Sequence, residues 1–92
     1  MNTDFKTSFL NDVKKVKDQS LKEKVGQSIT DVEKANGKQD IPELRKLKGA
    51  RKGIYYSIKI DHYRIGVTIE NEMVTFVVSI INLRSSREKF FQ

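Results

Sequence analysis

Residues 53–81 constrain the fold of this chain more than any other stretch, because they hold three runs of β-branched and aromatic residues. Two short polar pairs, Asp61-His62 and Asn71-Glu72, separate these runs. Runs of this composition between turn residues are typical of β-strands that pair with their neighbours. The stretch therefore predicts a three-stranded antiparallel meander.

The second of these runs alternates between apolar and mostly polar residues, which predicts a strand with one buried face. The apolar positions are Tyr63, Ile65, Val67 and Ile69, and those between them are Arg64, Gly66, Thr68 and Glu70. A turn at Asn71-Glu72 places three large apolar pairs on one face, namely Ile65–Val78, Val67–Phe76 and Ile69–Val74. This register is self-consistent, so we expect that face to be covered and the other face to form a shallow, open surface.

The first hairpin of the meander brings two cations together on the open face. If Asp61-His62 forms the loop, Lys59 lies directly opposite Arg64. Like charges across a strand pair repel, at a cost of up to roughly 1 kcal/mol. A site that tolerates this repulsion suits an anion such as phosphate. The alternative is that both side chains simply extend into solvent, as most exposed charges do.

The composition excludes several classes of site. The chain has 92 residues, which predicts one domain spanning residues 1–92. It has no cysteine and a single histidine, His62, so we expect no disulfide, no zinc centre and no metal or cofactor. We interpret His62 as a turn residue. No apolar run approaches the roughly 20 residues of a membrane span, and no signal peptide is evident, so we expect a cytoplasmic protein without membrane association.

The charge of the chain favours a polyanionic partner. Eighteen Lys and Arg residues against twelve Asp and Glu residues give a formal net charge of +6. A dense cluster of these cations, just before the first strong strand, consists of Arg45, Lys46, Lys48, Arg51 and Lys52. The cluster is either a solvated linker or a basic, RNA-binding rim beside the Lys59/Arg64 face.

The N-terminal third has helical periodicity. Phe5, Phe9, Val13 and Val16 recur at spacings of three and four residues, which predicts a helix over residues 4–17 with Thr3 or Asp4 as its cap. A short strand through Met1–Lys6 is the alternative.

A second helix follows a break at Asp18-Gln19. Ser20 and Glu23 have the spacing of a capping box. The apolar stripe of this helix is Leu21, Val25, Ile29 and Val32, and Asn36-Gly37 is a stop signal. Two helices joined by so short a break predict an antiparallel hairpin.

The connector over residues 37–53 contains one local signal. Asp40 to Glu43 predicts a capped helical turn with Pro42 near its start.

The order of these segments resembles the RelE/ParE superfamily of toxins from type II toxin–antitoxin modules. After the two helices, the matching segments are Leu47-Lys48-Gly49, Tyr56 to Ile60, Tyr63-Arg64-Ile65-Gly66, Phe76 to Ile80 and an arginine-containing tail. The implied fold is α+β and RelE-like: an N-terminal helical hairpin packed on a small antiparallel sheet. The resemblance covers nearly the whole chain and is most specific over residues 44–84.

The resemblance implies a toxin that acts with an acidic, partly disordered antitoxin as its partner. RelE-like members are metal-independent endoribonucleases that cut messenger RNA on the ribosome, whereas ParE-like members inhibit DNA gyrase. In the RelE-like reaction, the ribose 2′-OH attacks the adjacent phosphate, and cations stabilise the charge that develops there. The alternatives implied for this chain are therefore an mRNA endoribonuclease, a gyrase inhibitor or an inactive binding module.

Matching positions carry the catalytic residues over to Lys59, Arg64 and Arg84. The tail adds Arg87 and Phe90 to the RNA-binding set, with Phe90 able to stack on a base or to close the core. Two departures from the RelE-like pattern favour the alternatives: Ser57 replaces the first lysine of the Tyr-Lys-Ile-Lys strand, and the late tyrosine is absent.

Overall fold

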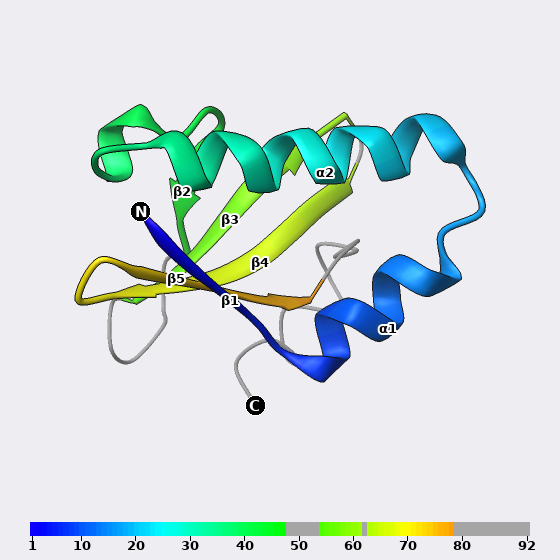
Figure 1. Ribbon diagram of the computed structural model, residues 1–92, viewed down its shortest axis with the longest axis horizontal. Coiled ribbons are helices and arrows are strands. Elements are labelled where there is room, and N and C mark those ends of the chain that lie inside the picture. The colour runs from blue at the N-terminus through cyan, green and yellow to red at the C-terminus, as the bar shows by residue number, and fades with distance from the viewer. Residues whose placement is uncertain (48–53, 62, 79–92) are drawn as a thin grey trace.

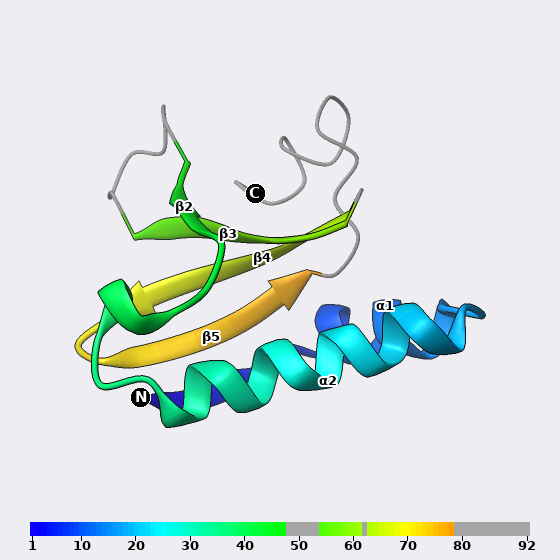
Figure 2. The ribbon, with the colours of Figure 1, turned by 90° about the horizontal axis from the view of Figure 1, so that it is seen from above.

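The computed structural model describes residues 1–47, 54–61 and 63–78. Two helices, α1 (Thr7–Lys15) and α2 (Gln19–Lys34), cover one face of a five-stranded mixed sheet (Figures 1 and 2). The strands are β1 (Asn2–Phe5), β2 (Leu44–Lys46), β3 (Tyr55–Ile60), β4 (Tyr63–Glu70) and β5 (Met73–Val78), in the spatial order β1-β5-β4-β3-β2. Strand β1 runs parallel to β5, and the other pairs are antiparallel. The predicted α+β class is confirmed.

The central meander has the predicted strands and, in its first hairpin, the predicted register. Lys59 is the Cα partner of Arg64, and Ile60 is the partner of Tyr63. At the second turn, Asn71 and Glu72 both have positive φ angles, of 52° and 65°. Two consecutive positive φ values match the two-residue turn whose twist suits a tight hairpin.

The second hairpin contains a β-bulge that the sequence did not predict. Val78 pairs with Gly66 rather than with Ile65, because Val77 is an extra residue in β5. A bulged residue loses ladder partners, and here the Val77 carbonyl oxygen accepts a hydrogen bond from Ser8 Oγ of α1 at 2.5 Å. The bulge thereby ties the first turn of α1 to the end of the sheet.

The chain begins with a strand, so the prediction of a helix over residues 4–17 was wrong at its start. Helix α1 begins at Thr7 after Lys6, and neither Thr3 nor Asp4 caps it. The alternative strand is confirmed as β1. Its pairing with β5 sets Phe5 beside Phe76, with ring centroids 5.3 Å apart. This long-range aromatic contact outweighs the local helical periodicity.

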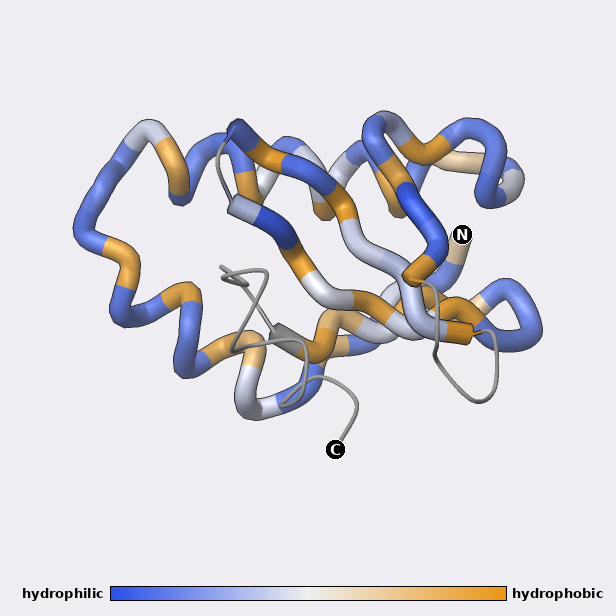
Figure 3. The backbone as a smooth tube through the Cα atoms, turned by 180° about the vertical axis from the view of Figure 1, so that it is seen from behind, coloured by the Kyte–Doolittle hydropathy of each residue, from blue (hydrophilic) through white to orange (hydrophobic). Residues whose placement is uncertain are grey.

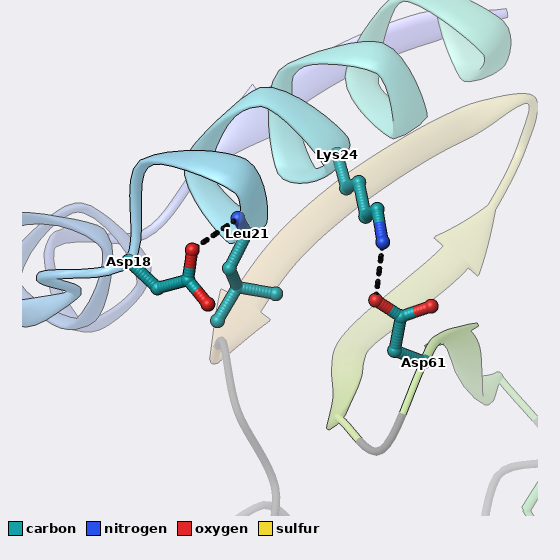
Figure 4. Close-up of polar contacts among 4 residues, drawn as sticks. All are labelled: Asp18, Leu21, Lys24 and Asp61. Atoms are coloured by element: carbon teal, nitrogen blue, oxygen red, sulfur yellow. Dashed lines mark hydrogen bonds and ion pairs between the residues drawn. The ribbon is translucent and has the colours of Figure 1, made fainter.

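The N-cap of helix α2 lies two residues before the predicted capping box. Asp18, not Ser20, caps the helix, and its Oδ1 accepts a hydrogen bond from the Leu21 backbone N–H at 3.3 Å (Figure 4). The helix ends at Lys34, just before the predicted stop at Asn36-Gly37. Beyond its last turn, the Ala35 carbonyl accepts a hydrogen bond of 2.6 Å from the amino nitrogen of Met1.

The connector contains a strand where the sequence predicted a loop. A 3-10 helix spans Lys38–Asp40, so the helical turn predicted over Asp40 to Glu43 lies earlier in the chain. Residues Leu44–Lys46 then form β2, which pairs antiparallel with β3. A strand of three residues is too short to produce a recognisable alternation.

The core lies between the sheet and the helices. Its buried apolar residues are Phe9, Val16, Leu21, Val25, Val32, Ala35, Ile41, Tyr56, Ile58, Ile60, Ile65, Val67, Ile69, Val74 and Phe76. The predicted covered face of the meander is therefore confirmed, and the hydropathy alternation along β3 and β4 is visible in Figure 3. Neither helix in the described part of the chain has the length and apolarity that a membrane crossing requires.

Candidate nucleic-acid interface

Lys59 and Arg64 lie side by side on the face of the sheet that the helices leave uncovered. They are direct Cα partners in the β3–β4 pair, so their side chains leave the sheet on the same side. The flanking Ile58 and Ile60 point to the opposite side, where they are buried in the core. Lys59 is exposed and Arg64 is half-buried. The hairpin therefore presents two cations close together, as its register predicted.

No acidic residue of the described structure neutralises this pair. Within residues 1–47, 54–61 and 63–78, neither Lys59 nor Arg64 forms a side-chain hydrogen bond or an ion pair. The carboxylate at the end of β3, Asp61, instead forms an ion pair with Lys24 of α2 (Figure 4). The hydrogen bond and the charge of Asp61 raise the pKa of Lys24. Positive charge on the uncovered face is thus left available for an anion.

The missed strand β2 adds a third cation to the same face. Arg45 is the Cα partner of Ser57, which lies two positions before Lys59 on β3, so the Arg45 side chain leaves the sheet on the Lys59/Arg64 side. Lys46 pairs with Tyr56, whose side chain is buried in the core, and it therefore points to the other side. Both residues are exposed. The sequence placed Arg45 and Lys46 together in one rim, whereas the structure separates them.

On the face that the helices leave uncovered, the residues in the middle are nevertheless buried. Ser57 is 2% exposed, and its partner Gly66 is also buried. The expected mixture of small and cationic groups is therefore present, but its small residues are buried: the exposed cations Arg45 and Lys59 lie beside the buried Ser57 and Gly66. The position at which the RelE-like pattern has its first lysine falls among these buried residues, at Ser57.

The remaining predicted site residues lie outside the described part of the chain. They are Lys48, Arg51, Lys52, Arg84, Arg87 and Phe90. Their assignment to catalysis or RNA binding stays a prediction.

A cavity of about 700 Å³ lies between α2 and the end of β3, and no pattern in the sequence indicated it. Its lining mixes the cations Lys24 and Lys59 with the carboxylates of Asp31, Glu43 and Asp61. Three carboxylates around one cavity disfavour a polyanion there, because like charges repel. A nucleic-acid backbone is better matched by the uncovered face.

Comparison with known proteins gives a structural match without a sequence match. No protein-family model matches the chain, and no curated protein matches it either.

Several solved toxin structures share the fold. The RelB–RelE antitoxin–toxin complex of Methanococcus jannaschii aligns with a TM-score of 0.74 and 22% identity, over 97% of this chain and 99% of the other. The heterotetrameric YoeB–YefM complex of Staphylococcus aureus aligns with a TM-score of 0.69 and 21% identity, over 89% and 97%. The isolated Escherichia coli RelE toxin aligns with a TM-score of 0.64 and 17% identity, over 99% and 98%. The chain therefore has the fold of the RelE and YoeB toxins, which confirms the resemblance at the level of the fold.

Proposed function

We propose that this chain is the toxin of a type II toxin–antitoxin module and that it cleaves messenger RNA on the ribosome, in the cytoplasm, without a metal ion. The observation that carries the proposal is the Lys59–Arg64 pair, which lies on the uncovered face without an acidic partner among the described residues. The toxin fold shared with RelE and YoeB supports the same conclusion.

In the proposed reaction, the ribose 2′-hydroxyl loses its proton to solvent, its oxygen bonds to the adjacent phosphorus, and the bond from phosphorus to the 5′-oxygen breaks, which produces a 2′,3′-cyclic phosphate and a 5′-hydroxyl. The phosphorus centre gains negative charge on its non-bridging oxygens during this step. The guanidinium of Arg64 can donate two parallel hydrogen bonds to these oxygens. The ammonium of Lys59 can stabilise the same charge or donate a proton to the leaving 5′-oxygen. Arg84 is the third proposed catalytic residue.

The proposed partners follow from the charge of the chain. A net charge of +6 favours association with messenger RNA and with the ribosome, which are both polyanionic. The RelE of Methanococcus jannaschii and the YoeB of Staphylococcus aureus were each solved in complex with an antitoxin. We propose an acidic antitoxin as the partner that keeps this chain inactive.

The test is to induce the chain without any antitoxin and to map messenger RNA 5′ ends during growth arrest. We expect new 5′ ends within translated regions, and Arg64→Ala should reduce their yield by about 10²–10³-fold because one charge-stabilising group is lost. Lys46→Ala, which removes a cation that points to the other side of the sheet, should cleave like the wild type. Growth arrest with intact transcripts would reject the nuclease proposal.

A gyrase inhibitor is the second candidate, and the burial of Ser57 favours it. This residue stands where RelE-like nucleases have a lysine, and a 2% exposed serine cannot supply that charge to RNA. Purified gyrase should then lose supercoiling activity at micromolar concentrations of the chain. Unchanged supercoiling would remove this candidate.

A further inference from the structure

The cavity between α2 and the end of β3 is lined by a buried hydroxyl group. Ser28 of α2 is only 8% exposed and contributes to the wall of this cavity. Within residues 1–47, 54–61 and 63–78, its hydroxyl forms no hydrogen bond. A buried polar group without a partner costs free energy, so such groups usually bind a protein atom, water or a ligand. Ser28 therefore marks the cavity as a candidate binding site.

A carboxylate lies beside this hydroxyl on the same helix. Asp31 is three residues after Ser28 in α2, so the two side chains are neighbours on one helix face, and both line the cavity. The amide Nε2 of Gln27 donates a hydrogen bond of 2.9 Å to Asp31 Oδ1, which leaves Oδ2 without a partner in the described structure. Hydroxyl and carboxylate oxygens both accept hydrogen bonds. Together they suit an ammonium group, which has three N–H donors and no acceptor.

A second carboxylate that lines the cavity is that of Glu43, from the segment just before β2. The one ion pair in the described part of the chain joins Lys24 to Asp61. Neither Asp31 nor Glu43 is therefore neutralised by a cation there. Lys59 also contributes to the lining, but its register in the β3–β4 pair turns its side chain to the uncovered face of the sheet. The cavity thus keeps negative charge at two places, one on α2 and one before β2.

Apolar side chains contribute a third part of the lining. Ile58 and Ile60 face the helical side of the sheet, where both are buried, and Pro42 lies beside them in the same cavity wall. An aliphatic stem gains free energy when it leaves water for such a surface. The lining therefore favours an organic cation with methylene groups over a bare metal ion.

We propose that this cavity binds an aliphatic diamine or a longer polyamine. One ammonium group would donate hydrogen bonds to Ser28 Oγ and Asp31 Oδ2, and another would pair with the carboxylate of Glu43. The methylene chain between them would contact Ile58 and Ile60. The inference goes beyond the proposed function and does not depend on it, because the binding requires neither RNA nor a protein partner.

Putrescine, a short linear diamine, and spermidine are the probes. Titration of either into the full-length ¹⁵N-labelled chain should shift the amide resonances of Ser28 and Asp31 in a saturable manner. n-Butylamine has the single ammonium of a lysine side chain and should bind about tenfold more weakly or worse, because it cannot meet both carboxylates. Magnesium chloride should give no saturable shift at Ser28, since this strongly hydrated ion gains nothing from an apolar wall.

Matched variants locate the binding. Asp31→Asn and Glu43→Gln should each weaken putrescine binding by about tenfold or more, because each removes one charge and nearly preserves the shape of the side chain. Glu23→Gln is the control, since Glu23 is an exposed carboxylate of the same helix but does not line the cavity. It should leave the affinity unchanged, and circular dichroism of each variant checks that the fold is retained.

The buried hydroxyl separates binding from folding. Ser28→Ala should weaken putrescine binding by about fivefold. The urea midpoint of the ligand-free variant should stay constant or rise, because the substitution removes a buried polar group that has no partner among the described residues. Putrescine at a concentration that saturates the wild type should raise the wild-type midpoint by more than that of Asp31→Asn.

Three results would overturn the inference: no saturable shift at Ser28, equal affinities for putrescine and n-butylamine, or equal losses in Glu23→Gln and Asp31→Asn. The outcome is separable from that of the proposed function. Diamine binding by a chain that cuts no transcript would support the cavity site and reject the nuclease. Cleavage of mRNA by a chain that binds no diamine would reject the cavity site alone.

Discussion

Asp61 at the end of β3 is held by Lys24 of α2, so the acidic residue nearest to Lys59 in sequence is engaged on the helical side. The pair connects the β3–β4 hairpin to a helix that packs on the other face of the sheet (Figure 4). This arrangement keeps a carboxylate from neutralising the Lys59–Arg64 pair, and it also links the position of the hairpin to the helical layer.

The contribution of this ion pair to stability should disappear at high pH. Asp61 raises the pKa of Lys24 above its ordinary value of 10.5, so the contribution is present below that value and is lost as the pH rises through the raised pKa. Urea unfolding of wild type and Lys24→Gln should therefore differ by a constant amount between pH 7 and 9. The difference should vanish when the pH exceeds the raised pKa. A difference that persists there would show that Lys24 acts through packing instead.

Arg45 should contribute to activity although it lies on a different strand from Lys59. Its register with Ser57 puts its guanidinium on the face that carries Lys59 and Arg64. We expect Arg45→Ala to lower RNA cleavage by about tenfold, equivalent to 1.4 kcal/mol of transition-state stabilisation. The neighbouring variant Lys46→Ala is the matched control, and equal losses in both variants would point to general electrostatic attraction rather than to a site.

Ser57→Lys should weaken the fold rather than restore a RelE-like active site. The side chain at this position is 2% exposed, so a lysine would either bury its charge or displace its neighbours. We expect a loss of about 1–3 kcal/mol in the free energy of unfolding, measured in urea. Ser57→Ala is the control and should be nearly neutral, because the Ser57 hydroxyl makes no hydrogen bond within the described residues. A stable and more active Ser57→Lys variant would contradict this account.

Gly26→Ala should stabilise the isolated chain. The added methyl group meets open space, and alanine is favoured over glycine in a helix interior by roughly 0.5–1 kcal/mol. The urea midpoint should rise while the slope of the transition stays constant. Gly37→Ala is the comparison: Gly37 precedes the 3-10 helix, and its added Cβ would lie 2.6 Å from Gln39 Oε1, so we expect no gain. A lower midpoint for Gly26→Ala would mean that α2 needs the glycine for its own geometry.

The parts of the fold that the sequence predicted correctly are those with a repeated local pattern. The alternation through β4 and the turn at Asn71-Glu72 indicate the strands of the meander. The loop expected at Asp61-His62 sets Lys59 opposite Arg64. Strand β1 depends instead on its pairing with β5, which no local pattern reports. The same limit applies to the bulge at Val77, since an extra residue becomes evident only when both strands are aligned.

The sequence predicted only part of the candidate site, because local patterns do not report strand pairing over long distances or tertiary burial. The Lys59–Arg64 pair follows from one hairpin, so local reasoning found it. Arg45 joins the pair through a strand of three residues, which is too short to be recognised. The burial of Ser57 depends on the tertiary arrangement and is not encoded in the alternation of β3, where this residue occupies a position expected to be open.

Strand β1 has a consequence for the order in which the chain can assemble. Its hydrogen-bonding neighbour is β5, and the ring of Phe5 stacks on that of Phe76. During synthesis, β1 must therefore wait until Met73–Val78 has emerged before it finds its place at the edge of the sheet. Until β5 has emerged, neither β1 nor the ring of Phe5 has its partner in the sheet.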